Sequence, residues 1–253
     1  EKEREELQYF MGDNKAIPIK EFIYDAPSDL LESPRDTSSK ILNSFVLNSP
    51  FIIGGSADLF GANKTYIKEG GDFSFDNYLG KNIYFGVREG AMGAILNGLA
   101  LCGFRPYGST FLAFSDYMRP SIRMACMMKL PIIYIFSHDS ISVGEDGPTH
   151  QPVEQLIGLR SIPNLEVFRP ADANEVIGSY KAIADASEGP AVITLSRNKL
   201  PILETTNAAS VSRGGYVVFD SERKADGIVI ATGEEVHQVI EAAKRLKVKG
   251  ISI

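Results

Sequence analysis

The sequence lacks the features that mark membrane-spanning, secreted and nucleic-acid-binding proteins. No apolar run approaches the roughly 20 residues that a helix needs to cross a bilayer. The charged first residues, EKEREELQYF, do not resemble a secretory signal. Lysine and arginine form no cluster, and the formal net charge is −6. We therefore expect a cytoplasmic protein whose partners include neither a membrane nor a nucleic acid.

Cysteine is also scarce, and its placement argues against two kinds of site. Cys102 and Cys126 are the only cysteines, and each lies in an apolar helical pattern. Two thiols do not make a disulfide framework. No Cys-x-x-Cys occurs, and the histidines lie far from either cysteine, so a zinc site is poorly supported. We expect two buried, reduced thiols and no metal-ligating residues in this chain.

Three common nucleotide-binding or catalytic motifs are absent as well. The run GVREGAMG (86–93) lacks the Gly-x-Gly-x-x-Gly spacing of dinucleotide-binding turns, and no Gly-x-x-x-x-Gly-Lys-Ser/Thr phosphate loop occurs. No Gly-x-Ser-x-Gly nucleophile elbow occurs either. What remains is a set of polar residues at the ends of successive predicted strands.

The sequence does contain a regular alternation of strand and helix patterns. Apolar runs such as PIIYIF (131–136) alternate with helical patterns such as 89–103, and the connections are short. Parallel strands that helices cover on both faces have this appearance. We therefore predict an α/β fold, a doubly wound, mainly parallel sheet over residues 35–200. Its site should lie beyond the carboxyl ends of the strands.

Three further segments flank the predicted sheet domain. Residues 1–34 are polar and are interpreted as a linker or arm, and residues 201–214 as a second linker. Residues 215–253 are predicted to begin a second α/β domain. Its predicted strands are 216–220, 226–232 and 250–253, and its predicted helix is 234–247. This unit has too few elements to close its own core, so we expect it to be truncated.

Ionisable side chains gather directly after the predicted strand PIIYIF. His138, Asp146 and His150 lie in the loop HDSISVGEDGPTHQP (138–152), which holds two of the chain's three histidines. Turns require glycine and proline but not imidazoles, and titratable clusters at strand ends indicate functional sites. Arg197 follows another predicted strand. An arginine there is usually solvated, but opposite two histidines it could bind a phosphate.

Glu89 has both a structural and a functional interpretation. It opens a predicted helix, where the helix dipole alone favours a carboxylate. However, the small residues Gly90, Ala91 and Gly93 would let another surface approach this helix closely. A glutamate held there could share a proton with a ring nitrogen.

An aromatic stripe also has two interpretations. Phe111, Phe114 and Tyr117 recur at three-residue spacing, a pattern more typical of a core than of a cofactor pocket. If the stripe faces Glu89, it forms an apolar slot for a flat heteroaromatic ring.

Several of these runs resemble the pyrimidine-binding middle domain of transketolases. They are GGSADL (54–59), REGAMG (88–93), STFLAFSDY (109–117), SHDSISVGEDGPTHQPVEQL (137–156), IPNLEVFRPADANE (162–175) and LSRNKLP (195–201). The resemblance extends over about residues 35–201, and residues 215–253 resemble the start of that family's C-terminal domain. Deoxyxylulose-phosphate synthase and the β chain of pyruvate dehydrogenase share the fold and the glutamate but do not combine GEDGPTHQP with GGSADL. Dihydroxyacetone synthase is a closer alternative.

The resemblance implies a thiamine-diphosphate enzyme, a transferase of the pentose phosphate pathway. Such an enzyme moves a two-carbon ketol unit from a ketose phosphate to an aldose phosphate. Glu89 would bond the ring nitrogen of the cofactor's pyrimidine and favour its imino tautomer, and His150 would be the second catalytic residue. The other cofactor-binding residues would be Phe114, Phe111, Tyr117 and Asp58.

The resemblance also implies how a sugar phosphate would be held. Asp146 would recognise a hydroxyl of the donor sugar, and His138, His150 and Arg197 would hold the sugar and its phosphate. Arg35 falls on the family's other phosphate-binding arginine. Ala62 occupies a substrate-binding position where the family usually has serine, so only its backbone N–H could contact the phosphate there.

Transketolases also have an N-terminal domain whose Gly-Asp-Gly…Asn motif binds a divalent cation, magnesium or calcium, that anchors the diphosphate. No such run occurs in these 253 residues. The resemblance also implies a homodimer with each site between subunits. This chain would supply the pyrimidine half, either as a fragment of a longer chain or as one subunit of a split enzyme, and would be inactive alone. The alternative is a non-catalytic module with a thiamine-enzyme-like fold, which would have no physical need for Glu89, Asp146 and His150.

Overall fold

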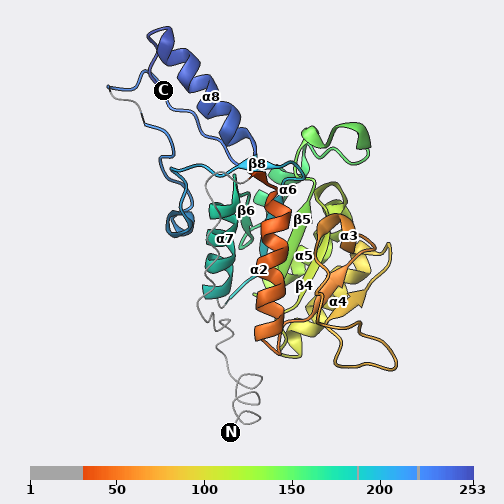
Figure 1. The fold of residues 1–253 in the computed structure, drawn as a ribbon. Helices are drawn as coiled ribbons and strands as arrows, with labels where there is room; N and C mark the ends of the chain where they lie inside the picture. Colours follow the sequence, from red (N-terminus) through yellow and green to blue (C-terminus); the bar gives the residue numbers. More distant parts are fainter. Residues whose placement is uncertain (1–30, 187, 221–222) are drawn as a thin grey trace.

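A six-stranded parallel sheet organises the chain in the computed structural model, which describes residues 31–186, 188–220 and 223–253 (Figure 1). The strand order is β3-β2-β4-β5-β7-β6, and every neighbouring pair is parallel. The strands are β2 (Gly54–Ser56), β3 (Asn82–Tyr84), β4 (Tyr107–Phe111), β5 (Ile133–Ser137), β6 (Glu166–Phe168) and β7 (Ala191–Leu195). The predicted arm falls mostly on residues 1–30, which lie outside the described residues.

Helices cover both faces of this sheet, as the doubly wound prediction requires (Figure 1). Helices α2 (Pro34–Asn48) and α7 (Ala173–Asp185) pack on one face, and α4 (Glu89–Leu101) and α5 (Arg119–Met127) on the other. Strand β5 shows the alternation: Ile135 belongs to the first core cluster, and Phe136 to the second. The predicted fold class is therefore confirmed. None of the described helices is long and apolar enough to cross a membrane.

Helix α2 brings Arg35 to the carboxyl ends of the strands. Ser33 caps the helix by accepting a hydrogen bond from the Asp36 N–H, and Pro34 occupies its first turn. The helix therefore begins at Pro34. This start fixes Arg35 in the first turn.

The segments predicted as linkers pack against the sheet domain where the structure describes them. Strand β1 (Leu31–Glu32) pairs antiparallel with β8 (Leu200–Pro201). The 3₁₀ helix η3 (Ala208–Arg213) lies on α7 at Gly178, where an added Cβ would lie 2.5 Å from the Ala208 carbonyl oxygen. Glycine thus permits this close contact. The ordered domain extends on both sides of the predicted range 35–200.

The second unit departs from its prediction. Helix α8 (Glu235–Val248) forms close to the predicted 234–247 and projects beyond the sheet (Figure 1). The strands predicted at 216–220, 226–232 and 250–253 do not form in the described parts of these ranges. The Asp226 N–H donates to the Ser252 carbonyl, but no ladder follows. A strand needs a partner for its backbone groups, and the described residues offer none here.

One of the two cysteine predictions is wrong. Both thiols are free, and Cys126 is buried in α5 as expected, but Cys102 is exposed. Cys102 is the C-cap of α4, after which Gly103 adopts a positive φ of 94°. The chain leaves the helix there, and the apolar helical pattern does not continue into the core.

Candidate active site

The predicted site residues lie at the carboxyl ends of four neighbouring strands. Asp58 follows β2, Phe111 ends β4, His138 follows β5 and Arg197 follows β7. The strand order reverses next to β2, since β3 lies on one side of it and β4 on the other. Crevices beyond such reversals are the usual binding sites of open α/β sheets. The predicted site residues therefore lie where a sheet of this topology offers a binding crevice, and their roles stay predictions.

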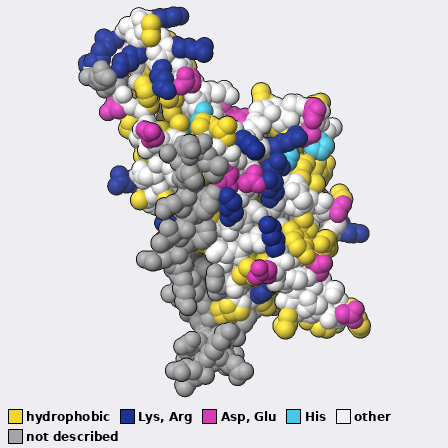
Figure 2. Space-filling model, in the orientation of Figure 1, with side chains coloured by type: hydrophobic (Ala, Val, Ile, Leu, Met, Phe, Trp, Pro, Cys, Tyr) yellow, Lys and Arg dark blue, Asp and Glu magenta, His cyan; other side chains and the backbone are white. Residues whose placement is uncertain are grey.

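Charged side chains from three segments meet in a corner that we call the cationic corner, formed by Arg35, His138, Asp146 and Arg197. Arg197 Nη1 donates to Asp146 Oδ2 at 3.0 Å, and His138 Nε2 lies 3.9 Å from the same oxygen. Arg35 Nη1 donates to the Ala62 carbonyl at 2.6 Å. Figure 2 shows Lys, Arg and His side chains close together near the start of α2. Two of the four corner residues are arginines and one is a carboxylate, so the corner favours an anion.

Arg35 has an unsatisfied donor in this corner. Its Nε is buried and has no hydrogen-bond partner in the part of the chain that the structure describes. Burial lowers the pKa of Arg35, Asp36 opposes this effect, and the positive charge of Arg197 adds to it. The two arginines therefore lie within electrostatic reach of each other. A buried guanidinium N–H without an acceptor is costly unless a ligand supplies one.

His138 is held neutral in this corner. Burial, followed by the positive charges of Arg35 and Arg197, lowers its pKa to about 4, although Asp146 opposes the shift. The backbone of His138 has a φ of 59°, a left-handed conformation that directs the ring away from the course of β5. Its ring lies against that of Phe111, tilted by 32° and with centroids 3.8 Å apart. His138 thus joins the cationic corner to the aromatic residues.

The aromatic stripe forms one continuous surface because of its local structure. Phe111 ends β4, and residues Leu112–Met118 form the 3₁₀ helix η1. In a 3₁₀ helix side chains three residues apart eclipse one another. The Phe111 and Phe114 rings stack at 5.7 Å, and Phe114 and Tyr117 follow at 6.4 Å. The three-residue spacing in the sequence therefore becomes a single aromatic face.

His150 lies edge-on against this aromatic face. Its ring centroid is 5.7 Å from that of Phe111 and 5.3 Å from that of Phe114. Its Nδ1 is 2.8 Å from the hydroxyl oxygen of Thr149. The loop that contains both histidines therefore brings both of them to Phe111, and His150 to Phe114 as well.

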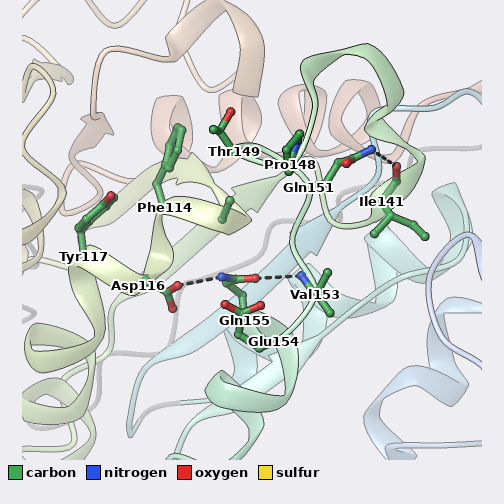
Figure 3. Close-up of a pocket in the computed structure, with 11 residues that line it drawn as sticks. Phe114, Asp116, Tyr117, Ile141, Pro148, Thr149, Gln151, Val153, Glu154 and Gln155 are labelled. Atoms are coloured by element: carbon green, nitrogen blue, oxygen red, sulfur yellow. Dashed lines mark hydrogen bonds between the residues drawn. The ribbon is translucent and has the colours of Figure 1, made fainter.

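A pocket of about 440 Å³ opens beside this surface (Figure 3). Phe114, Tyr117 and Thr149 line one part of it. Below them, Gln155 Nε2 donates to Asp116 Oδ2 at 2.8 Å and ties helix α6 (Gln155–Arg160) to η1. Tyr117 is 67% exposed, so one side of the aromatic face is open to solvent in this chain.

Glu89 is the first residue of α4 and is buried, with 8% exposure. Neither a hydrogen bond nor an ion pair to its carboxylate is found in the part of the chain that the structure describes. A Cβ on Gly90 would lie 3.2 Å from the Tyr117 carbonyl, and one on Gly93 would lie 2.7 Å from the Ser121 Cβ. The small residues of α4 therefore admit the chain's own η1 and α5.

The structure brings most of the predicted residues together, but not all of them by direct contact. The cationic corner contains Arg35, His138, Asp146 and Arg197, and the Ala62 carbonyl is bonded to Arg35. The aromatic face contains Phe111, Phe114, Tyr117 and His150. Asp58 is exposed, with a φ of 64°, and like Glu89 has no such contact to either group within the described residues. The carbonyl of Ala62, rather than its N–H, is the group engaged in this structure.

Sequence reasoning missed residues behind the site. Asn63 and Ser137 are fully buried and connect α3 (Phe60–Asn63) to the end of β5. Glu234, from the second unit, accepts hydrogen bonds from Ser140 at 2.6 Å and Ser196 at 2.9 Å. A serine at the end of an apolar strand was the available signal for Ser137. No local pattern indicated Glu234.

The parallel sheet, with an aromatic face and a cationic corner at one end, defines a ligand-binding α/β domain. Residues 33–202 match the family described as "Transketolase, pyrimidine binding domain", and residues 214–253 match "Transketolase-like TK C-terminal domain". The chain therefore belongs to the transketolase family, which is thiamine-diphosphate dependent.

Individual relatives agree with this assignment. A transketolase of Bacillus subtilis is 48% identical over 236 residues, covering 91% of this chain and 35% of that protein. A structure of the R525L mutant of Pichia stipitis transketolase superposes with a TM-score of 0.87 at 40% identity, covering 95% of this chain and 36% of that one. A structure described as "Split gene transketolase, inactive beta4 tetramer" has a TM-score of 0.66 at 27% identity, covering 88% of this chain and 70% of that one. The chain spans about a third of the length of the curated relatives it matches.

Proposed function

We propose that this chain provides the pyrimidine half and the sugar-phosphate pocket of a transketolase. The observation that carries the proposal is the union of two surfaces at one sheet edge. An aromatic face is continuous, through Phe111 and His138, with a corner that holds two arginines. The first surface suits a flat ring, and the second suits a phosphate. A ketol transfer between sugar phosphates needs both.

The residues present fit the apolar end of thiamine diphosphate. Phe111, Phe114 and Tyr117 offer a continuous aromatic surface beside an open pocket, and Glu89 is a buried residue whose carboxylate has no protein partner among the described residues. In this proposal Phe114 holds the pyrimidine ring, and Glu89 shares a proton with its ring nitrogen. Asp58 lies near the cofactor. The bound cofactor supplies the carbon nucleophile and electron sink of the reaction.

The charged end of the cofactor is assigned to a domain outside these 253 residues. A diphosphate is bound through a divalent cation with oxygen ligands, magnesium or calcium in this proposal. No group of three or more potential metal-ligating side chains occurs within residues 31–186, 188–220 and 223–253. We propose that the diphosphate-binding domain of a second subunit supplies the cation site, in a homodimer. The open side of the aromatic face, at Tyr117, supports this arrangement.

The cationic corner is proposed to bind the substrate. Arg35, through its unsatisfied Nε, and Arg197 hold the phosphate. Asp146 accepts a hydrogen bond from a sugar hydroxyl, and His150 on the aromatic face exchanges a proton near the reacting carbon. The Ala62 carbonyl orients Arg35. The free thiols of Cys102 and Cys126 support the cytoplasm as the compartment.

Two alternatives make different predictions. A dihydroxyacetone-synthase-like enzyme would share the cofactor site and differ in the sugars it accepts. A non-catalytic module would not need Glu89 or the cationic corner. The inactive tetramer is a property of the split-gene relative, and it supports our expectation that this chain alone is inactive.

A reconstitution experiment tests the proposal. The chain is mixed with a separately produced diphosphate-binding domain, and thiamine diphosphate binding and ketol transfer are measured with and without magnesium. We expect no turnover by the chain alone and metal-dependent turnover by the mixture. Turnover by the isolated chain, its mass confirmed, would contradict the half-site assignment. Absence of cofactor binding by an assembled mixture would favour the non-catalytic module.

A further inference from the structure

A series of buried hydrogen bonds runs through the domain and ends on His138. Asn63 Nδ2 donates to Ser56 Oγ at 3.4 Å, and Ser137 Oγ donates to Asn63 Oδ1 at 2.6 Å. Ser137 Oγ is also 2.7 Å from His138 Nδ1. Ser56, Asn63 and Ser137 are fully buried, so no water competes for these groups. None of the three belongs to the cationic corner or the aromatic face.

The direction of each bond follows from counting protons, beginning at a backbone carbonyl. Ser56 Oγ donates its only proton to the Ser109 carbonyl at 3.1 Å, because a carbonyl can only accept. The Ser56 oxygen therefore accepts from its other neighbours, the Leu59 N–H at 3.1 Å and the Asn63 amide. The NH₂ group of Asn63 must then face Ser56, and its carbonyl oxygen must face Ser137.

The donors and acceptors of Ser137 likewise determine which ring nitrogen of His138 carries the proton. Ser137 donates its single proton to Asn63 Oδ1, so toward His138 it can only accept. We infer that Ser56, Asn63 and Ser137 are positioning residues that hold His138 as the Nδ1–H tautomer, leaving a bare Nε2 that faces the cationic corner as an acceptor. The fixed Ser109 carbonyl thus determines, through three side chains, which nitrogen of His138 is protonated.

The groups around the His138 ring favour its neutral form, in which only one ring nitrogen carries a proton. The groups that face it are Arg35 from α2, Asp146 from the 3₁₀ helix η2 (Ile141–Asp146), His150 from the following loop and Arg197 after β7. Burial and the two arginines lower the pKa of His138, so the ring is neutral near pH 7. Its Nε2 lies 3.9 Å from Asp146 Oδ2, which is too far for a hydrogen bond.

The inference deepens the proposed function and rests on it only for the identity of the ligand. A bare Nε2 accepts a hydrogen bond from a sugar hydroxyl or from a protonated phosphate oxygen. It cannot donate to a phosphate dianion.

The tautomer can be measured without substrate, on the full 253-residue chain labelled with ¹⁵N-histidine. Long-range ¹H–¹⁵N spectra at pH 7.5 distinguish protonated from bare ring nitrogens. The chain has three histidines, and the signals of His138 are those lost in His138→Gln. We expect a protonated Nδ1 and a bare Nε2. A wild-type spectrum with a protonated Nε2 would overturn the inference.

Variants of the positioning residues test the cause. Asn63→Leu frees the Ser137 hydroxyl to donate to Nδ1, so the tautomer should change to Nε2–H, whereas Ser137→Thr should retain Nδ1–H. Asn97→Leu is the matched control: it removes another buried amide, which donates to the Ser121 carbonyl at 3.1 Å, and should leave His138 unchanged. An Nδ1–H tautomer that persists in Asn63→Leu would overturn the inference.

Ser137→Ala is the second variant and answers the question if Asn63→Leu does not fold. It removes the acceptor of Nδ1–H, and the Nδ1–H preference should be lost. Persistence of that preference would exclude the role of Ser137. Because these spectra contain no substrate or cofactor, the absence of ketol transfer in the reconstituted enzyme would refute the proposed function and leave this result standing.

Discussion

The sheet domain and the C-terminal segment 214–253 have similar sequence patterns but differ in structure. The run PIIYIF forms β5, which lies between β4 and β7 and contains Ile135 with no exposed surface. The run DGIVIAT forms no strand, and Ile230 within it is 90% exposed. Helices, in contrast, form in both regions. The comparison shows that an apolar pattern becomes a strand only where other strands satisfy its backbone.

The C-terminal segment nevertheless contributes to the site through its first turn of helix. Arg169, after β6, donates to Asp139 at 2.8 Å, to the Thr232 carbonyl at 3.0 Å and to Glu235 at 2.9 Å. Asp139 directly follows His138, so this cluster supports the loop that carries the site. The dependence of the site on the segment can be tested.

The largest expected effect is that of Arg169→Leu. The substitution leaves Asp139 buried without its partner, and removing one member of a buried pair costs about 3–5 kcal/mol. Urea unfolding of the chain measures the loss. Lys244→Ala, which removes the exposed pair with Glu241, is the control and should change stability far less. Equal effects of the two substitutions would show that the Arg169 cluster does not join the regions.

The second prediction concerns pH and His138. Its pKa is about 4 in the folded chain, compared with 6.5 for an unperturbed histidine, so below pH 6.5 the unfolded state binds more protons. Stability should therefore fall as the pH falls from 6.5 to 4, by up to about 3 kcal/mol from this group. Urea unfolding at pH 7.5 and 4.5 measures the fall. His138→Gln should reduce it, and an unchanged pH dependence in this variant would exclude His138 as its source.

The third prediction concerns Glu89 in the complete enzyme. Glu89→Gln keeps the shape of the side chain but cannot share a proton with the pyrimidine. We expect turnover to fall by at least two powers of ten, which corresponds to about 2.7 kcal/mol or more of barrier, with the circular dichroism spectrum unchanged. Glu69→Gln, an exposed glutamate in the same domain, is the control and should retain turnover. Near-normal activity of Glu89→Gln would remove Glu89 from the catalytic residues.

The fourth prediction concerns the cationic corner. Arg197→Ala and Arg35→Ala should each raise KM for phosphorylated sugars, since each removes charge-assisted hydrogen bonds worth roughly 1.5–3 kcal/mol. The comparison is between a phosphorylated sugar and its unphosphorylated analogue in the complete enzyme. If KM rises equally for both substrates, the arginines do not bind the phosphate.

The sequence predicted the sheet domain well because its signals are local and mutually consistent. The apolar runs gave strands at the predicted places, and strand ends and 3₁₀ geometry place the aromatic and histidine side chains next to one another, while their roles stay predictions. The sequence could not predict the links to Asn63 and Glu234. These contacts join residues 74 and 94 positions apart, and they depend on tertiary packing rather than on any local pattern.

The strands of the C-terminal segment were predicted wrongly for the opposite reason. Their local pattern is sound, but partner strands are a property of the assembled sheet and not of the run itself. Helix α8 was predicted correctly because its backbone bonds are internal to the helix. Within one segment, the helix, which depends on local bonds, was predicted correctly, and the strands, which depend on distant partners, were not.

The smallest expected effect tests this distinction directly. Ile230→Ala removes an exposed side chain with no strand partner among the described residues, so the stability of the chain should change by no more than about 0.5 kcal/mol. Ile135→Ala is the matched substitution in β5 and should cost about 2–5 kcal/mol, because it opens a cavity in a closed core. Urea unfolding of both variants measures the difference. A large loss for Ile230→Ala would mean that DGIVIAT pairs in solution, and the contrast between the two regions would then be withdrawn.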